Sequence, residues 1–511
     1  MGVTFLLAAC GGKGGNGTDA ETEPEAALDA ADAVHEPECS LDDECADTLY
    51  CNGVERCLEG VCMDGDPVVC DDEDVCTEDS CSEDEERCEY EPLDADEDGY
   101  AAETGVGGIP CGGTDCDDSD PDVNPGARLD CLAAPDVNMN CNDIPDWEEV
   151  VLTPVGTDVR VTDHIQDTTQ PVIAWSGSEY GAAWTDDRHG GSEIYFTRLD
   201  TAGTIVGSEL RVTDATDSSA VPRISWTGSQ YGIAWHRGVI ADTEIYFARV
   251  GADGAMIGTE LRVTTAVRLS SYADIAWTGS AWGLVWQDSR RPLGGEDVYF
   301  QHVGGDGALV GGNVQVIRLN AALSFPRMTW SGSEFAIAWA DNPEGNFEVY
   351  FARLDGTGSM VGSELRLTSA AENSGTASIV WTGSEYAIAW VDARDGNNEI
   401  YLARVSASGT KLTSDIRITD FLLSSDSPYL EWTGRDFGLA FADHRDETQI
   451  WFVRIAVDGT MRNDEVKITT DPATSLLPCL AWNGSEFGLT WGDFRHDPLR
   501  AQVYFNALEC P

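Results

Sequence analysis

The sequence predicts an all-β protein in which residues 150–511 form a closed, seven-bladed β-propeller. Tryptophans recur there at steps of 51, 51, 53, 51, 51 and 50 residues, and the same strand-like phrase returns around each of them. A period near 50 residues with strand-like content is typical of propellers and solenoids. The seven repeating tryptophans are Trp175, Trp226, Trp277, Trp330, Trp381, Trp432 and Trp482.

Each repeat contains four expected strands, which we name a to d in chain order. In the first repeat they read PVIAW, YGAAW, EIYFTRL and ELRVT, and Gly-rich or Asp-rich turns separate them. Apolar residues occupy both alternating faces of strands b and c. This pattern is expected of a sheet that neighbouring blades cover on both sides.

The two ends of the array predict how the ring closes. The last repeat has strands a, b and c but no d, whereas residues 156–162 (GTDVRVT) match strand d and precede the first strand a. We expect this N-terminal strand to complete the seventh blade, because closure removes exposed sheet edges. A linear solenoid, the alternative, would need distinct caps. The repeat pattern of residues 154–511 resembles that of TolB-like and WD40-like propellers.

Charge and cysteine content set residues 1–150 apart from the propeller. They hold 44 acidic residues against four basic ones, in a chain whose net charge is -61. Such a field repels nucleic acid and attracts divalent cations or basic partners, so we expect no nucleic-acid binding. Fourteen of the 16 cysteines lie in the first 141 residues. This density is typical of an oxidising, extracytoplasmic compartment.

The first ten residues predict a lipid anchor. They end in Leu7-Ala8-Ala9-Cys10, which resembles the lipobox of bacterial lipoproteins. This resemblance implies that residues 1–10 form a lipoprotein signal, cleaved before Cys10, and that Cys10 is acylated as the new N-terminus. The apolar run is too short to span a membrane. The Gly-rich, then acidic stretch 11–38 is typical of a disordered tether. An accidental apolar start is the alternative; otherwise we expect a protein that is lipid-anchored at the outer membrane or cell surface.

Residues 39–93 predict a disulfide-rich module. Nine cysteines punctuate the stretch from Cys39 to Cys88, which has almost no apolar run and is too short to build a core. A zinc site is the alternative, but the cysteine spacing is not that of a zinc ribbon and no histidine lies among them. The phrase CDDEDVCTEDSC at 70–81 resembles the short cysteine repeats of secreted slime-mould and myxobacterial proteins.

Residues 94–149 predict an irregular, acidic module that binds calcium. Asp94, Asp96 and Asp98 alternate before Gly99, which places three carboxylates on one side of a tight loop. A hard cation such as calcium collects oxygen ligands in this way, whereas a solvated acidic face is the alternative. The stretch from Asp94 to Cys141 resembles the metal-binding motif proposed for myxobacterial MopE-type surface proteins. Its second acidic cluster contains Asp115, Asp117, Asp118, Asp120, Asp122 and Asn124.

Copper is disfavoured in this module, because no histidine lies between residues 36 and 163 and the available ligands are hard oxygens. Residues 138–149 (NMNCNDIPDWEE) resemble a thrombospondin type 3 calcium loop. Asparagines replace the usual aspartates, which removes charge and weakens such a site. The ligands that this resemblance implies are Asn138, Asn140, Asn142, the Ile144 carbonyl, Asp146 and Glu149.

Comparison of the repeats predicts one recognition face. The a–b and c–d loops of an antiparallel blade lie on one face of the disc, and the b–c and d–a loops lie on the other. The a–b loops are nearly identical, whereas the b–c and d–a loops differ between repeats, so the second face is the better candidate for recognition. Asp-x-Arg recurs in five b–c loops and is expected to tie adjacent blades through charge-assisted hydrogen bonds.

Charged residues also occur near the expected centre of the ring. Arg223, Asp274 and Arg327 stand three residues before their tryptophans, where the other repeats have uncharged residues. His236 and Arg291 are further candidates, from unusual b–c loops. We expect a site for an anionic or sugar-like ligand there; an ordinary buried ion pair is the alternative.

These observations predict a surface-anchored binding or scaffold lipoprotein, with a calcium-stabilised N-terminal module and a propeller that binds a protein or a glycan. The alternative is an extracytoplasmic hydrolase or lyase that acts on polysaccharide. Binding is favoured over catalysis because the sequence shows no defensible catalytic triad, zinc-protease motif or phosphate loop. No organic cofactor is expected. Fold class by itself does not decide between the two functions.

Overall fold

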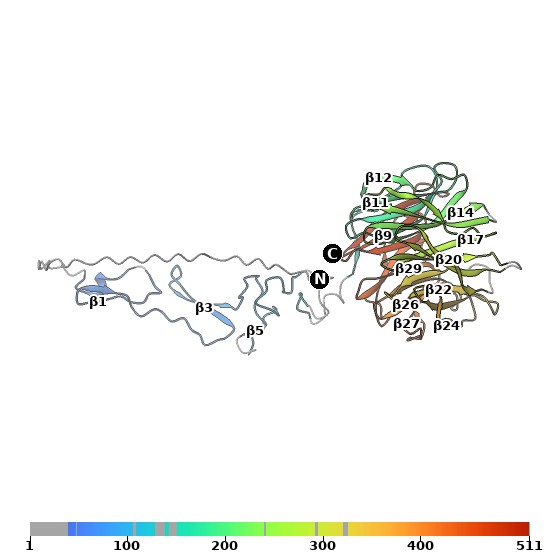
Figure 1. Ribbon diagram of the computed structural model, residues 1–511. Coiled ribbons are helices and arrows are strands. Elements are labelled where there is room, and N and C mark those ends of the chain that lie inside the picture. Colours follow the sequence, from blue (N-terminus) through green and yellow to red (C-terminus); the bar gives the residue numbers. More distant parts are fainter. Residues whose placement is uncertain are drawn as a thin grey trace, which may run out of the picture. The chain divides into compact units, whose positions relative to one another are not determined.

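The computed structural model describes residues 39–47, 49–105, 109–127, 138–142, 151–239, 242–291, 295–319 and 325–509 (Figure 1). Two compact units are present. One comprises the described residues up to Ala95 together with Ala101–Gly113, and the other comprises Asp96–Tyr100 and the residues from Thr114 onward. Cys10, Asp146 and Glu149 lie outside the described residues. Within these ranges, no helix is long and apolar enough to cross a membrane.

The second unit contains a propeller of seven antiparallel sheets, which confirms the predicted fold class. Within each sheet the strands pair in the order a, b, c, d. The first four blades are β9 (Thr168–Trp175), β10 (Tyr180–Asp186), β11 (Glu193–Leu199) and β12 (Ile205–Arg211); β13 (Ser218–Trp226), β14 (Gln230–Val239), β15 (Asp242–Gly251) and β16 (Met256–Arg262); β17 (Ser270–Trp277), β18 (Ala281–Asp288), β19 (Asp297–Gly304) and β20 (Leu309–Arg318); and β21 (Arg327–Trp330), β22 (Phe335–Asp341), β23 (Glu348–Leu354) and β24 (Met360–Arg366).

The remaining blades follow the same plan, and the last of them lacks its own strand d. Blades five to seven are β25 (Ser374–Trp381), β26 (Glu385–Asp392), β27 (Glu399–Ser406) and β28 (Ile416–Arg417); β29 (Ser425–Trp432), β30 (Asp436–Asp443), β31 (Gln449–Ala456) and β32 (Val466–Lys467); and β33 (Ser475–Trp482), β34 (Phe487–Asp493) and β35 (Gln502–Glu509).

The predicted closure of the ring is confirmed. Strand β8 (Val159–Arg160) pairs antiparallel with β35, and so does β7 (Thr153–Pro154) just before it. The N–H of Val161 donates to the carbonyl of Val503 at 2.9 Å, and the N–H of Val503 donates to Oγ1 of Thr162 at 2.9 Å. The N-terminal strand therefore supplies the fourth strand of the seventh blade.

Blades pack through aromatic side chains that lie over small residues of strand b. A Cβ built on Gly181 would come within 2.4 Å of the Tyr231 ring in the next blade. The same contact joins the seventh blade to the first, where a Cβ on Gly488 would lie 2.6 Å from the Tyr180 ring. Glycine is required there because the neighbouring ring takes the place of a side chain.

The repeated Asp-x-Arg motif is structural, but it acts within a blade rather than between blades as predicted. Asp186 is fully buried and accepts hydrogen bonds from Nε1 of Trp184 at 2.9 Å and from Nε of Arg188 at 2.9 Å. The Arg188 guanidinium lies 4.1 Å from the Tyr195 ring centre and pairs with Glu209 at 2.7 Å, both in the same sheet. Because the arginine bonds the aspartate two residues before it, its side chain folds back onto its own sheet.

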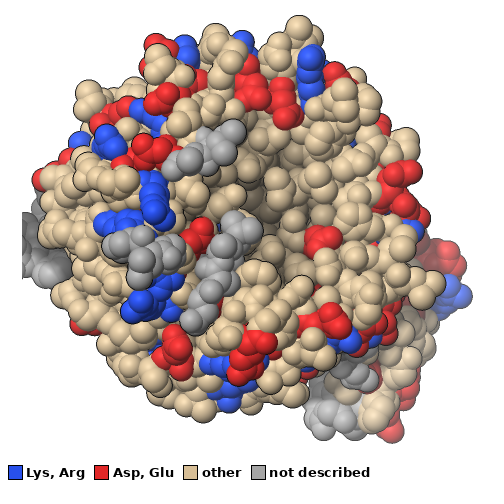
Figure 2. All heavy atoms as spheres, turned by 90° about the vertical axis from the view of Figure 1, so that its right-hand side faces the viewer, with Lys and Arg blue, Asp and Glu red and all other residues tan. Residues whose placement is uncertain are grey.

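A different set of arginines connects neighbouring blades. Nη1 of Arg198, in strand c of blade one, donates to the carbonyl of Ala252 in blade two at 3.3 Å. Arg353 of blade four donates to the carbonyl of Ala407 in blade five at 3.1 Å. Both acceptors lie in c–d turns, so these connections are on the face with the uniform loops. The opposite face, which carries the b–c and d–a loops, is hollowed at its centre (Figure 2).

The first unit is held together by disulfides instead of a core. Among its described residues, the only buried apolar side chains are Cys39, Cys45 and Ala102. Its elements are the 3-10 helix η1 (Asp42–Glu44) and the hairpins β1 (Arg56–Leu58) with β2 (Val61–Met63), β3 (Thr77–Ser82) with β4 (Arg87–Pro92), and β5 (Thr104–Gly105) with β6 (Ile109–Pro110).

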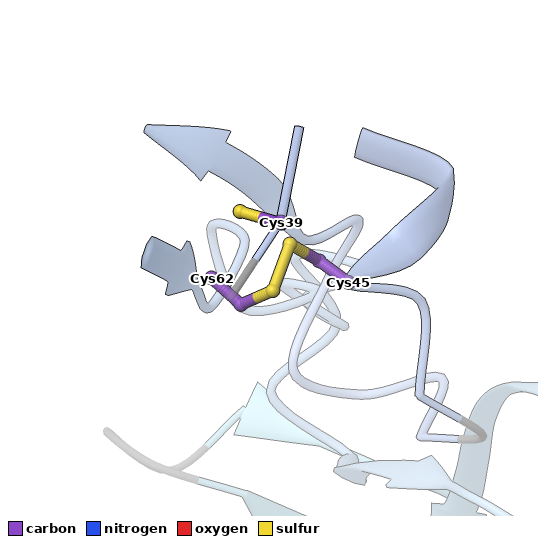
Figure 3. Close-up of side chains that lie close together, drawn as sticks. All are labelled: Cys39, Cys45 and Cys62. Carbon is purple, nitrogen blue, oxygen red and sulfur yellow. A yellow bond between two sulfur atoms is a disulfide. The ribbon is translucent and has the colours of Figure 1, made fainter. Parts of the chain in front are cut away.

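Six disulfides confirm the predicted disulfide framework. The close group of Cys39, Cys45 and Cys62 is not a zinc site, because Cys45 bonds to Cys62 (Figure 3) and Cys39 bonds to Cys57. Among the described cysteines only Cys479 is free, and it is buried. The other four disulfides are Cys51–Cys81, Cys70–Cys88, Cys76–Cys111 and Cys116–Cys141.

Candidate functional site

The candidate site is the central channel of the propeller. Strand a is the innermost strand of every blade, so its residue three positions before the tryptophan lies at the ring's centre. Two cavities, of about 360 Å³ and 230 Å³, have these residues in their linings. We call the set the channel ring; it consists of Val172, Arg223, Asp274, Arg327, Ser378, Tyr429 and Cys479.

The structure brings Arg223, Asp274 and Arg327 together and leaves two positive charges against one negative charge. Nε of Arg223 lies 3.7 Å from Oδ1 of Asp274, whose Oδ2 accepts a hydrogen bond from the N–H of Met328 at 2.8 Å. The side chain of Arg327 makes no hydrogen bond or ion pair with any described residue. Burial, and then the charge of Arg327, lowers the pKa of Arg223 to about 10. Arg223 is therefore still protonated at neutral pH, beside Arg327 and opposite one aspartate.

Glu431 is a channel residue that the sequence analysis missed. It precedes Trp432 in β29 and lines the larger cavity together with both ring arginines and Asp274. Burial raises the pKa of Glu431 to about 7. Comparison of the repeats one position before the tryptophan could have found it, because the other six residues there are uncharged. They are Ala174, Ser225, Ala276, Thr329, Val380 and Ala481.

The two other predicted ligand residues do not line either cavity. His236 lies in β14 with its ring edge-on to Tyr272, at 5.6 Å between ring centres. Burial, followed by the charge of Arg223, lowers its pKa to about 4, so it is neutral at physiological pH. Arg291 pairs with Asp297 at 3.4 Å and donates to the carbonyl of Leu319 at 2.9 Å. Arg291 therefore holds a loop of its own blade.

A left-handed residue in or just before each strand a lines the smaller cavity. The seven residues have φ between 39° and 58°, none is glycine, and most adjoin a register shift in the pairing of strand a with strand b. Such a conformation costs on the order of 1–3 kcal/mol per residue and persists where the surrounding structure imposes it. This part of the lining is therefore preorganised. These residues are Gln170, Val221, Tyr272, Phe325, Thr376, Ser427 and Leu477.

A second candidate site, for a metal ion, lies in the acidic segment. Asp96, Asp98 and Asp115 each offer a carboxylate oxygen within 4.8 Å of the others, and Asp118 offers one that close to Asp96. Asp115 is 1 % exposed; its Oδ1 accepts a hydrogen bond from the N–H of Asp117 at 2.9 Å, whereas its Oδ2 has no hydrogen-bond partner among the described residues. Burial, followed by the charges of Asp98, Asp96 and Asp118, raises the pKa of Asp115. A buried carboxylate oxygen without a donor, among other carboxylates, fits a hard divalent cation.

The remaining predicted metal ligands are not counted in this four-aspartate site. Asp94 belongs to the first unit, whereas the four aspartates of the site belong to the second. Asp117 is exposed and accepts a hydrogen bond from the Ser119 hydroxyl at 2.7 Å. Asp120 and Asp122 are also exposed, and both belong to one turn. Asn138 accepts a hydrogen bond from the N–H of Asn142 at 3.3 Å.

Asn124, from the second acidic cluster, is 9 % exposed and accepts a hydrogen bond from the N–H of Gly126 at 2.8 Å.

The structure describes only part of the segment 138–149, which resembles a calcium loop. Asn140 is half-buried. Ile144, Asp146 and Glu149 lie outside the described residues, so the implied ligand set stays a prediction.

Comparisons with known proteins give a likeness of fold. No protein-family profile and no characterised protein sequence matches the chain significantly. A prolyl endopeptidase matches 67 % of this chain and 47 % of its own at 14 % identity and a TM-score of 0.41. A Trypanosoma rangeli sialidase with the inhibitor DANA matches 70 % of this chain and 59 % of its own, at 10 % identity and a TM-score of 0.40. A GH43 endo-arabinanase from Bacillus licheniformis matches 50 % of this chain and 100 % of its own, at 12 % identity and a TM-score of 0.31.

This chain therefore spans about half the length of the first of these proteins and under two thirds of the second. Likeness at such identities and TM-scores carries no argument about activity. The assignment of the fold rests on the strand pairing of the seven blades, and the function has to be argued from the channel and from the acidic segment.

Proposed function

We propose that this protein is an exported binding protein of the cell surface, whose propeller holds an anionic ligand in the central channel. The observation that carries this proposal is the pair Arg223 and Arg327, which face one aspartate where two cavities meet. Burying a cation without a counter-ion is costly, so an anion in the channel removes an existing penalty. An arginine fork also fits a carboxylate or sulfate with two parallel hydrogen bonds.

The test of this proposal is calorimetric titration of the whole protein with an oligomer of galacturonate, with the neutral galactose oligomer as comparison. Arg327→Gln is expected to weaken galacturonate binding by about tenfold or more, since a hydrogen bond to a charged group contributes about 1.5–3 kcal/mol. Arg318→Gln is the matched control, because Arg318 is exposed at the end of β20. Equal binding of charged and neutral oligomers would exclude the anion site.

Glu431 adds a pH dependence to this prediction. Its pKa of about 7 means that it loses its negative charge as the pH falls through neutrality. Anion binding is therefore expected to be tighter at pH 6 than at pH 8, and Glu431→Gln should remove this difference.

Catalysis on an acidic polysaccharide is the second candidate function. It is favoured by Glu431, which lines the same cavity as Asp274 and has the pKa of a useful general acid. The same titration separates the two functions. Binding gives a heat signal that returns to the baseline soon after each injection. Turnover gives a heat signal that continues until the oligomer is consumed.

The N-terminal region is proposed to hold the propeller at the cell surface. Its six disulfides indicate an extracytoplasmic protein. The cluster around Asp115 is proposed to bind calcium, which would stiffen a segment that has little apolar core.

Anchoring through Cys10 stays a prediction from the lipobox-like start. With the anchor, the wild-type protein is expected in the membrane fraction, and Cys10→Ser should release it to the soluble fraction. A wild-type protein that fractionates as soluble would rule the anchor out.

A further inference from the structure

The smaller cavity of the channel combines charge and apolar surface. Arg223 and Arg327 contribute to its lining, and so do Tyr272, Phe325 and Leu477. Prolines that follow the left-handed residues complete the wall: Pro171, Pro326, Pro428 and Pro478. Because proline fixes its own backbone, this wall has little freedom to rearrange. The lining therefore fits a ligand that carries one carboxylate on an apolar body.

The face around this cavity exposes large apolar side chains. Leu422 is 96 % exposed, Leu499 83 %, Val267 82 % and Ile165 77 %, and all four lie in b–c or d–a loops. In the described a–b and c–d segments of the opposite face, large apolar side chains are less exposed: Leu412 is 49 % exposed and Met461 43 %. Figure 2 shows that uncharged residues make up most of the surface around the hollow. Strongly exposed apolar side chains on the face that holds the cavity favour a contact with another protein.

The volume of the smaller cavity favours a protein segment over a small molecule as its ligand. Its volume of about 230 Å³ is below the range of about 300–1,000 Å³ that is usual for small-molecule sites. A free small acid would also leave the exposed leucines of the face uncovered. A chain end, by contrast, can place its last residue in the cavity while the preceding residues cover the face.

We propose that the b–c and d–a face binds the carboxyl-terminal segment of a partner protein. Its terminal carboxylate pairs with Arg327 and Arg223, its last apolar side chain lies against Tyr272 and Phe325, and its preceding apolar residues lie on the loop that contains Leu422. This inference rests on the proposed anion site and specifies the source of the anion.

The experiment measures fluorescence polarisation with the whole oxidised protein. The probes are fluorescein-labelled hexapeptides of apolar residues that end in phenylalanine, one with a free carboxylate and one with a terminal amide. The free acid is expected to bind, and the amide about tenfold or more weakly. Arg327→Gln should remove this preference, since it deletes the charge that the carboxylate meets. Arg318→Gln should keep it.

A second pair of variants tests the apolar face. Leu422→Ser is expected to weaken binding of the free-acid peptide, whereas Leu412→Ser should not, because Leu412 is 49 % exposed but lies near the outer edge of its blade. Equal binding of acid and amide peptides would overturn the inference, and so would an unchanged affinity in Arg327→Gln. If the galacturonate oligomer binds in an Arg327-dependent way but no peptide does, the peptide inference fails and the anion site stands. If neither binds, both fail.

Discussion

Deleting residues 151–162 is expected to unfold the whole propeller at room temperature. The segment includes Leu152, Val161 and Thr162, which are 3 %, 4 % and 0 % exposed against blade seven. Losing one large buried apolar side chain costs about 2–5 kcal/mol, and a native protein is stable by only about 5–15 kcal/mol. The deletion also leaves β35 as an open edge. Circular dichroism during heating should show no cooperative transition for the deletion variant.

A point substitution makes this prediction more specific. Val161→Asp places an unpaired carboxylate in a buried position and should lower the melting temperature strongly. Ile165→Asp makes the same type of change only four residues further along, where the side chain is 77 % exposed. This variant should keep the melting temperature of the wild type. A deletion variant with the melting temperature of the wild type would contradict the closed ring.

Calcium is expected to bind the acidic segment, and removing it should expose that segment to proteolysis. Calorimetry on the whole oxidised protein should give a dissociation constant of roughly 10⁻⁴ to 10⁻³ M, the range of extracellular calcium modules. Calcium should also slow cleavage by a glutamate-specific protease, because a ligand that binds only the folded form stabilises it in proportion to the logarithm of its concentration.

Asp115→Asn is the decisive variant for this site. It keeps the size of the side chain but removes the buried charge, so calcium affinity should fall by about tenfold or more. Asp122→Asn removes the same charge from an exposed position outside the cluster and should bind calcium as the wild type does. If millimolar calcium neither binds nor protects the wild-type protein, the acidic residues are a solvated face.

The fold was predictable because every repeat has the same pattern of strands and turns. Seven copies of the pattern reduce the effect of ambiguity in any one of them. The last repeat lacks strand d, and residues 156–162 match that strand, so they complete the seventh blade. The position three residues before each tryptophan likewise predicts Arg223, Asp274 and Arg327 near the centre. The same comparison, two positions further along strand a, would also have found Glu431.

The sequence by itself therefore determined the ring, its closure and the residues at its centre, since these depend on periodicity and chain order. Only the tertiary structure decided which side chains meet. It showed that Arg188 turns back onto Tyr195 and Glu209 of its own blade, and that Arg291 is held by Asp297. It also joined Asp115 to Asp96 and Asp98, which the sequence separates by many residues. Such partners depend on rotamers, loop paths and burial, and spacing along the chain does not encode them.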